Sequence, residues 1–395
     1  MTRTPSPAFN MEGTPPRPAK TPVTTKQLER ERVDNYHWMK DENWQAVMVD
    51  PSQLNTDIRA HLEAENAYTQ KVLQGTDALK TTIFEEMKGR VESEDSSVPD
   101  PDGHFAYYHR FRQGDEHGLY ARIPFNPETR EPDGDEEIIL DADALAAEQD
   151  GFFDMGSLTH SPNHSRIAYT VDRQGSENYE VFVQNIGSPP RSTGIKTSTG
   201  GIEWAADAAT LFWTERDDNQ RPYAVFAKNI DDESSDPQLI YKETDPGFFV
   251  SVSDSDSSNF IEISAHNHTT SEVRLIPSKT PFKSPECFSE RHEGREYSLH
   301  EQGGYSYILT NSGGAVDFQI MRRAVNDTDA PWEPFIPHTP RTLILGLEAY
   351  KHHLVWLVRE NALPRIIIRD MRSGKQHDIA FDEAAYGLGL MGGYE

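Results

Sequence analysis

Several histidines and the single cysteine of this sequence could in principle bind a metal ion or act as a nucleophile, and their spacing favours neither role. His266 and His268 could place two imidazoles on the same side of a strand or turn, as a metal pair requires. No third ligand lies near them in the sequence, so a surface turn is the more direct interpretation. His352 and His353 would point to opposite faces of a strand, and Cys287 has no fixed histidine nearby to activate its thiol.

Serine catalysis requires a different pattern. A serine nucleophile on a sharp strand-to-helix turn needs glycine on both sides, in the order G-x-S-x-G. That motif does not occur in the 395 residues. The nearest matches, Gly304-Tyr-Ser306 and Ser198-Thr-Gly200, each lack one glycine. A phosphate-binding G-x-x-x-x-G-K loop is missing as well. We therefore expect no catalytic, no cofactor-binding and no metal-binding residues in this chain, and no cofactor.

The elements that would position any site follow a repeat. A short β-branched and aromatic strand returns six times at a spacing of about 44 to 50 residues after a longer first interval, which is typical of the multi-stranded blades of a β-propeller. Each blade buries its apolar faces only against its neighbours, so the repeat predicts a ring. An array of β-sandwiches could show a similar spacing, but repetition without linkers favours the ring. The six copies are residues 105–108, 167–170, 211–214, 261–264, 307–310 and 355–358.

Further strands accompany these copies. After a short polar turn a second strand follows in the later repeats, as at residues 179–183 and 224–227, and such hairpins predict multi-stranded blades. The longer first interval contains residues 136–141, which are expected to form a strand, and residues 143–147, which are expected to form one or two helical turns. The expected fold is mainly β, a seven-bladed type of propeller with about six blades present, over residues 89–395.

The residues before the repeat differ from it in composition and in apolar periodicity. Residues 1–22 are rich in proline and threonine and are expected to form a flexible arm. Residues 23–88 are expected to form a separate helical segment without strands, in which the pattern turns helical from about Thr25. Ile58 and Leu62 are spaced i, i+4, and apolar residues continue at similar intervals to Met87.

Composition narrows the possible partners. A formal net charge of -27 disfavours nucleic acid and anionic membranes, and favours cationic ligands. The single cysteine forms no internal disulfide, which suits a reducing compartment. No apolar run approaches the length of a membrane span, and the first residues lack the apolar segment of a secretory signal. A cytoplasmic location is the expectation.

Several motifs resemble the prolyl oligopeptidase family, and their combination is most similar to its oligopeptidase B branch. The resemblance begins near residue 14 and covers nearly the whole chain. Its N-terminal motifs are Asp34-Asn-Tyr-His-Trp-Met-Lys-Asp41, Leu62-Glu-Ala-Glu-Asn-Ala-Tyr68 and Glu92-Ser-Glu-Asp-Ser-Ser-Val-Pro99. It continues through Glu136-Glu-Ile-Ile-Leu-Asp141, Trp204-Ala-Ala-Asp207, Thr270-Ser-Glu-Val-Arg-Leu275 and Ala385-Tyr-Gly-Leu-Gly389.

The resemblance implies a serine endopeptidase of the prolyl oligopeptidase type, in which a seven-bladed propeller covers an α/β-hydrolase domain and admits only short peptides. It also implies cleavage after Arg or Lys, and short basic peptides as substrates. The sequence departs from the family in one respect, because the Ser, Asp and His of the catalytic triad and the α/β-hydrolase domain are not found here. We therefore expect this chain to be the helical and propeller part of such an enzyme, inactive alone. The alternative is a stand-alone propeller that serves as a peptide- or protein-binding scaffold.

Overall fold

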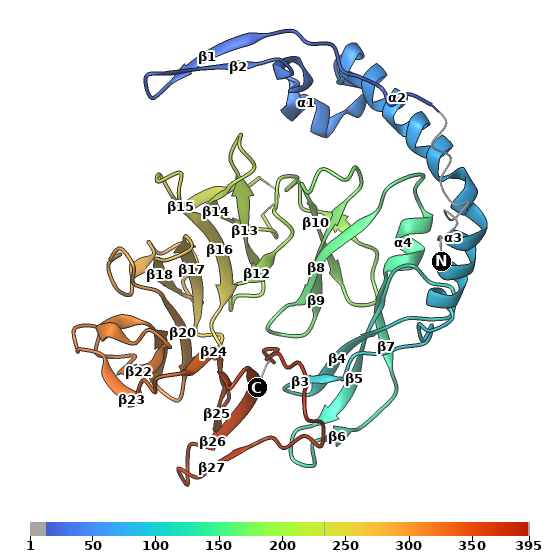
Figure 1. Ribbon diagram of the computed structural model, residues 1–395. Coiled ribbons are helices and arrows are strands. Elements are labelled where there is room, and N and C mark those ends of the chain that lie inside the picture. The colour runs from blue at the N-terminus through green and yellow to red at the C-terminus, as the bar shows by residue number, and fades with distance from the viewer. Residues whose placement is uncertain (1–12, 233, 394–395) are drawn as a thin grey trace, which may run out of the picture. The chain divides into compact units, whose positions relative to one another are not determined.

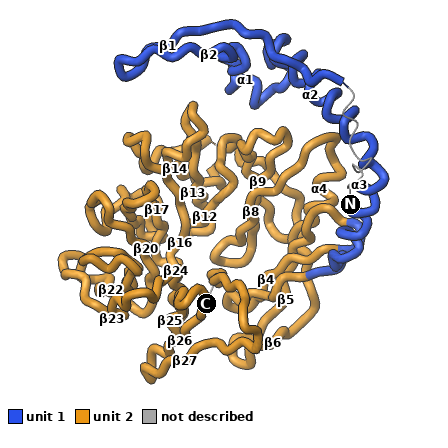
Figure 2. Tube along the Cα trace, in the orientation of Figure 1, with its two compact units in different colours: residues 1–95, 112–114 blue, residues 96–111, 115–395 orange. Residues whose placement is uncertain are grey.

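The computed structural model describes residues 13–232 and 234–393. The chain divides into two compact units, one made of residues 1–95 and 112–114 and the other of residues 96–111 and 115–395 (Figure 2). Among the described residues, no helix is long and apolar enough to cross a membrane.

The first unit opens with a β-hairpin, which the sequence pattern did not predict. Strands β1 (Val23–Gln27) and β2 (Arg30–Asp34) pair in antiparallel fashion. Leu28 and Glu29 form the two-residue turn, and both have positive φ angles, of 49° and 59°. Such turns match the twist of paired strands, and the β-branched residues of β1 favour an extended backbone. The expectation of a strand-free helical segment is therefore wrong for residues 23–34.

Residues 37–88 of the first unit are mainly helical, as expected. They contain α1 (Trp44–Val49), α2 (Thr56–Leu73) and α3 (Asp77–Lys88). Asn55 caps α2, because its side-chain oxygen accepts hydrogen bonds from the backbone N–H groups of Asp57 and Ile58. Of the predicted arm, residues 1–12 lie outside the described residues. The next residues are held by the indole of Trp38, which donates to the carbonyl of Ala19 at 2.8 Å.

The second unit consists of six antiparallel sheets arranged as the blades of a ring (Figure 1). The first blade contains β3 (Asp100–Asp102), β4 (Phe105–Arg110), β5 (Leu119–Asn126) and β6 (Glu131–Pro132). The second contains β8 (Asp154–His160), β9 (Arg166–Asp172), β10 (Glu180–Asn185) and β11 (Arg191–Ser192). The third contains β12 (Ile202–Trp204), β13 (Thr210–Arg216), β14 (Pro222–Asn229) and β15 (Gln238–Lys242). The fourth blade contains β16 (Phe249–Asp254), β17 (Phe260–His266), β18 (Ser271–Pro277) and β19 (Glu286–Cys287). The fifth contains β20 (Tyr297–Gln302), β21 (Tyr305–Thr310), β22 (Gln319–Ala324) and β23 (Glu333–Ile336). The sixth contains β24 (Thr342–Ala349), β25 (His353–Glu360), β26 (Leu363–Asp370) and β27 (Gln376–Asp378).

The six repeated sequences occupy equivalent places. Each lies in the second strand of its sheet, namely β4, β9, β13, β17, β21 and β25. A second strand is paired on both sides and covered on both faces, which explains its continuous apolar character. In β13, for example, Leu211, Phe212 and Trp213 are fully buried. The predicted ring and the equivalence of its repeats are confirmed, with six blades formed by the described residues.

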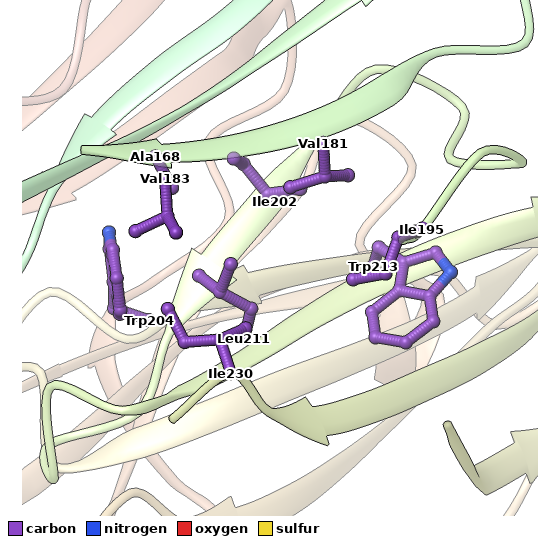
Figure 3. Close-up of a cluster of buried hydrophobic side chains, with 9 residues drawn as sticks. All are labelled: Ala168, Val181, Val183, Ile195, Ile202, Trp204, Leu211, Trp213 and Ile230. Atoms are coloured by element: carbon purple, nitrogen blue, oxygen red, sulfur yellow. The ribbon is translucent and has the colours of Figure 1, made fainter. Parts of the chain in front are cut away.

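Hydrophobic clusters join each blade to the next. Each of five clusters links two adjacent sheets, from the pair of the first and second to the pair of the fifth and sixth. The cluster between the second and third blades packs Val181 and Val183 of β10 against Leu211 and Trp213 of β13 (Figure 3). Because each apolar face is buried only by its neighbour, every blade depends on the adjacent one for its stability.

The longer first interval folds as predicted into a strand and a helix. Strand β7 (Glu137–Asp141) pairs with β5, and α4 (Ala142–Ala147) follows directly. The carboxylate of Asp141 caps α4 by accepting a hydrogen bond from the N–H of Ala144 at 3.0 Å.

Candidate functional site

The first strand of each blade lies closest to the centre of the ring (Figure 1). Residues of these strands line a cavity of about 790 Å³, which we call the channel. Its lining includes Asp102 of β3, His160 of β8, Glu203 of β12, Asp254 of β16 and Gln302 of β20. With Lys351, which lies between β24 and β25, residues from all six blades line one space, which makes the cavity a property of the ring rather than of a single blade.

Carboxylates dominate the charge of this channel. Asp102, Glu203, Asp254 and Asp256 line the cavity, whereas Lys351 is the one lysine or arginine among the described residues that do so. The side chain of Glu203 makes no hydrogen bond or ion pair with any described residue. Burial, and secondarily the charge of Asp254, raise the pKa of the Glu203 carboxyl to about 8. Glu203 is therefore largely protonated at neutral pH and becomes negative at mildly alkaline pH.

Two further carboxyls share this tendency. Desolvation by the surrounding strands raises the pKa of Asp254 even though this residue is exposed, and the hydroxyl of Ser258, which donates to this carboxylate at 3.0 Å, opposes the shift. Burial also raises the pKa of Glu262 on β17, and the nearby charges of Asp256 and Asp254 add to the effect. A cation bound near these carboxyls would oppose the shifts, because it favours the charged forms.

A histidine cluster stands at one side of the cavity. The Nε2 of His160 lies 2.7 Å from Oδ2 of Asp102, and the His160 ring stacks on Tyr107 with 3.8 Å between ring centroids. The hydroxyl of Tyr107 is 2.9 Å from Nδ1 of His164, whose pKa is lowered chiefly by burial. The donor atoms of Asp102, His160 and His164 lie within 4.8 Å of one another. Because Asp102 and Tyr107 belong to the first blade and both histidines to the second, the cluster joins two blades.

This cluster is poorly arranged for a metal ion. The rings of His160 and His164 are nearly parallel, at 16°, with centroids 5.3 Å apart. A metal must lie in the plane of each imidazole that binds it, so these rings would have to rotate and give up the Tyr107 contacts. The geometry is that of a hydrogen-bonded and stacked contact between blades.

The residues that the sequence analysis singled out do not meet in a site. His266 ends β17 and His268 lies in the following turn, and both side chains lie at the surface of the blade. His352 and His353 are exposed at the start of β25. Cys287 lies in the short outer strand β19, and partial burial raises the pKa of its thiol.

The two serines nearest to a nucleophile motif are also built into the sheets or their turns. Ser306 is buried in β21, and the hydroxyl of Ser198 donates to the carbonyl of Gly201 at 3.3 Å. Neither lies on a strand-to-helix turn.

Sequence reasoning missed the channel carboxylates. Asp102, Glu203 and Asp254 each lie in the first strand of a blade, directly before a repeated strand. They precede the start of the repeated sequence by 3, 8 and 7 residues, so they share no fixed position in the repeat. Only the closure of the ring brings them to one space.

Comparison with known proteins shows which protein family this chain matches. The profile of the family described as "Prolyl oligopeptidase, N-terminal beta-propeller domain" matches residues 15–395. Protease 2 of Moraxella lacunata is 26% identical over 91% of this chain and 50% of its own length, and dipeptidyl aminopeptidase BI of Pseudoxanthomonas mexicana is 28% identical over 97% and 53%. The fold is similar to that of oligopeptidase B from Leishmania major, with a TM-score of 0.82 at 24% identity over 94% of this chain and 54% of that one. The chain spans about half the length of the curated relatives it matches.

Proposed function

Because this chain belongs to the prolyl oligopeptidase family, whose N-terminal β-propeller domain it matches, we propose that it forms the propeller part of an oligopeptidase B-like serine endopeptidase. In this proposal the enzyme cleaves short peptides after Arg or Lys, and the propeller is of the seven-bladed type. Hydrolysis is performed by an α/β-hydrolase domain outside these 395 residues, and the chain does not hydrolyse peptides by itself. The proposed location is the cytoplasm.

The role of the propeller is to select what reaches the catalytic domain. The observation that carries this proposal is the carboxylate-lined cavity of about 790 Å³ at the centre of the ring. A space of this size accommodates a short, extended peptide and excludes a folded protein. Asp102, Asp254 and Asp256 make it electronegative, so a peptide with arginine or lysine is concentrated there relative to an acidic one.

The proposal can be tested by peptide binding to the purified chain. Fluorescence anisotropy would compare a labelled tetrapeptide containing two arginines with one containing two glutamates, at low and at high salt. We expect the basic peptide to bind preferentially, and its affinity to fall with salt because screening weakens exposed charge interactions. Equal binding of the two peptides would contradict selection by charge.

The raised pKa of Glu203 supplies an internal check on where the peptide binds. As pH rises through the pKa of about 8 this carboxyl ionises, so the basic peptide should bind more tightly, by about 3- to 10-fold if one further ion pair forms. Glu203→Gln should abolish this gain. Glu128→Gln, which removes a charge in the outer turn between β5 and β6, should retain it. A stand-alone scaffold would instead be indicated by tight binding of a folded protein that the peptide does not displace.

A further inference from the structure

Three side chains from three consecutive blades converge at a second place in the ring, separate from the His160 cluster. Asp256 lies in the turn between β16 and β17, His300 lies on β20, and Glu348 lies on β24. One donor atom from each of the three lies within 4.8 Å of the others. Nδ1 of His300 is 3.4 Å from Oδ2 of Asp256. Since β20 pairs with β21 and β24 pairs with β25, His300 and Glu348 both rest on a rigid backbone.

The group is not satisfied by the protein alone. Nδ1 of His300 is buried and has no hydrogen-bond partner among the described residues. Buried polar atoms of this kind are uncommon, and each calls for a partner such as water or an ion. The carboxylate of Glu348 makes no hydrogen bond or ion pair with a described residue. The buried Nδ1 of His300, 3.4 Å from Asp256, and the nearby carboxylate of Glu348 thus both lack a hydrogen-bond partner among the described residues.

We propose that Asp256, His300 and Glu348 bind a divalent transition-metal ion of the zinc class. One imidazole and two carboxylates are ligands that Zn²⁺ accepts in tetrahedral sites. Two ligand atoms at about 2.1 Å from a tetrahedral metal are about 3.4 Å apart, which is the separation of His300 Nδ1 and Asp256 Oδ2. Water fills the remaining position, because Asp256 borders the large cavity.

The surroundings of Asp256 support this assignment. Its Oδ2 accepts a hydrogen bond from the backbone N–H of Glu301 at 3.0 Å, which fixes the orientation of the carboxylate. Such second contacts orient metal ligands and strengthen binding. The imidazole favours Zn²⁺ over Ca²⁺, since calcium selects sites made of oxygen alone. The site goes beyond the proposed peptidase role and would tie the fourth, fifth and sixth blades together at the centre of the ring.

Two other histidines provide matched comparisons. His338 also has a buried nitrogen, Nε2, without a hydrogen-bond partner, and it lies 3.5 Å from Oδ2 of Asp317. No third ligand joins that pair among the groups that the described residues form. His160 belongs to the cluster in which the stacked rings oppose metal binding. His338→Gln and His160→Gln therefore test whether any histidine near a carboxylate suffices.

The experiment is a titration of the full 395-residue chain, freed of metal by chelation, with Zn²⁺ alone at neutral pH, followed by calorimetry and by competition with a chromophoric indicator. We expect one ion per chain, bound more than about 10-fold more weakly by His300→Gln and by Glu348→Gln. His338→Gln and His160→Gln should bind as the wild type does. Far-UV circular dichroism of each metal-free variant would confirm folding.

A second measurement needs no variant. Acylation of histidines by diethylpyrocarbonate, mapped by mass spectrometry, should show His300 protected by Zn²⁺ and His338 unchanged. Ca²⁺ at the same concentration should give no protection. The proposal is overturned if no ion binds, if His300→Gln and Glu348→Gln both bind Zn²⁺ as tightly as the wild type, if His160→Gln alone loses binding, or if Zn²⁺ leaves the acylation of His300 unchanged.

Discussion

His160 of the second blade is held from both sides by the first blade: its Nε2 lies 2.7 Å from Oδ2 of Asp102, and its ring stacks on Tyr107. We expect His160→Ala to lower the free energy of unfolding by about 2–4 kcal/mol, since it removes a hydrogen bond to a charged group and an aromatic contact. Urea unfolding measures the change. The exposed His292→Ala should stay within about 0.5 kcal/mol of the wild type, and an equal midpoint for His160→Ala would contradict the role of this contact.

The carboxyl of Glu203 should make the fold less stable at alkaline pH. Its pKa is raised from 4.5 to about 8 in the folded chain, so the stability it contributes is full below pH 4.5 and is lost as pH rises through 8. Above that pKa, Glu203→Gln should therefore melt at a higher temperature than the wild type, by roughly 2–4 °C for each kcal/mol that ionisation of the carboxyl costs the folded wild type. In mild acid the two proteins should melt at similar temperatures. Calorimetry under both conditions checks this, and an unchanged difference between wild type and variant would argue against a buried, ionising carboxyl.

Trp213 should be among the most costly side chains to truncate. It is fully buried between the second and third blades (Figure 3). Trp213→Ala should lower the free energy of unfolding by about 3–5 kcal/mol, because a large cavity forms where two blades meet. Leu239→Ala, in the outer strand β15, removes a side chain that is 48% exposed and should cost far less. Similar losses for the two variants would mean that the interface between these blades contributes little to stability.

Helix α3 carries an exposed apolar face, formed by Leu79, Ile83, Phe84 and Met87. Patches of this kind favour association, so we expect the chain to self-associate despite its charge of -27. Ile83→Lys should shift the chain toward the monomer in light scattering after gel filtration. Thr81→Lys makes the same charge change on the side of α3 away from Leu79 and Ile83 and should not. A compact monomer in the wild type would refute the expectation.

The purified chain should not hydrolyse arginine- or lysine-linked esters and amides. Without a positioned nucleophile and base, no acyl-enzyme forms. A fluorophosphonate probe should therefore leave its serines unlabelled, in contrast to a peptidase of the family assayed alongside. Stoichiometric labelling of one serine would overturn this prediction.

The repeat could be recognised in the sequence because the second strand of each blade is buried on both faces. Strands such as β13 must be apolar at nearly every position, and that requirement leaves a continuous signal. The hairpin of β1 and β2 was missed for the opposite reason. Its residues are mostly exposed, so no apolar periodicity distinguished a strand from a charged helix. The turn at Leu28 and Glu29 also lacks the glycine or asparagine that usually announces positive φ angles.

The candidate sites are formed by residues that are far apart in the sequence. Asp256, His300 and Glu348 are each separated by roughly one repeat of the propeller and meet because three blades place them at the centre. A search for neighbouring ligands found His266 and His268 instead, which lie at the surface beside a turn. In a ring of repeats, groups that meet at the centre are one period apart, so local spacing is the wrong guide.

The outermost strands of several blades are short: β11 and β19 have two residues each and β27 has three. An unpaired strand edge is a template on which another chain can add a strand, and its strength grows with the number of free backbone donors and acceptors. Strands as short as these present too few such groups to hold an incoming strand in register. The circumference of the ring is therefore resistant at these blades to strand addition and to the growth of cross-β fibrils, even where a blade is crowded against a second molecule.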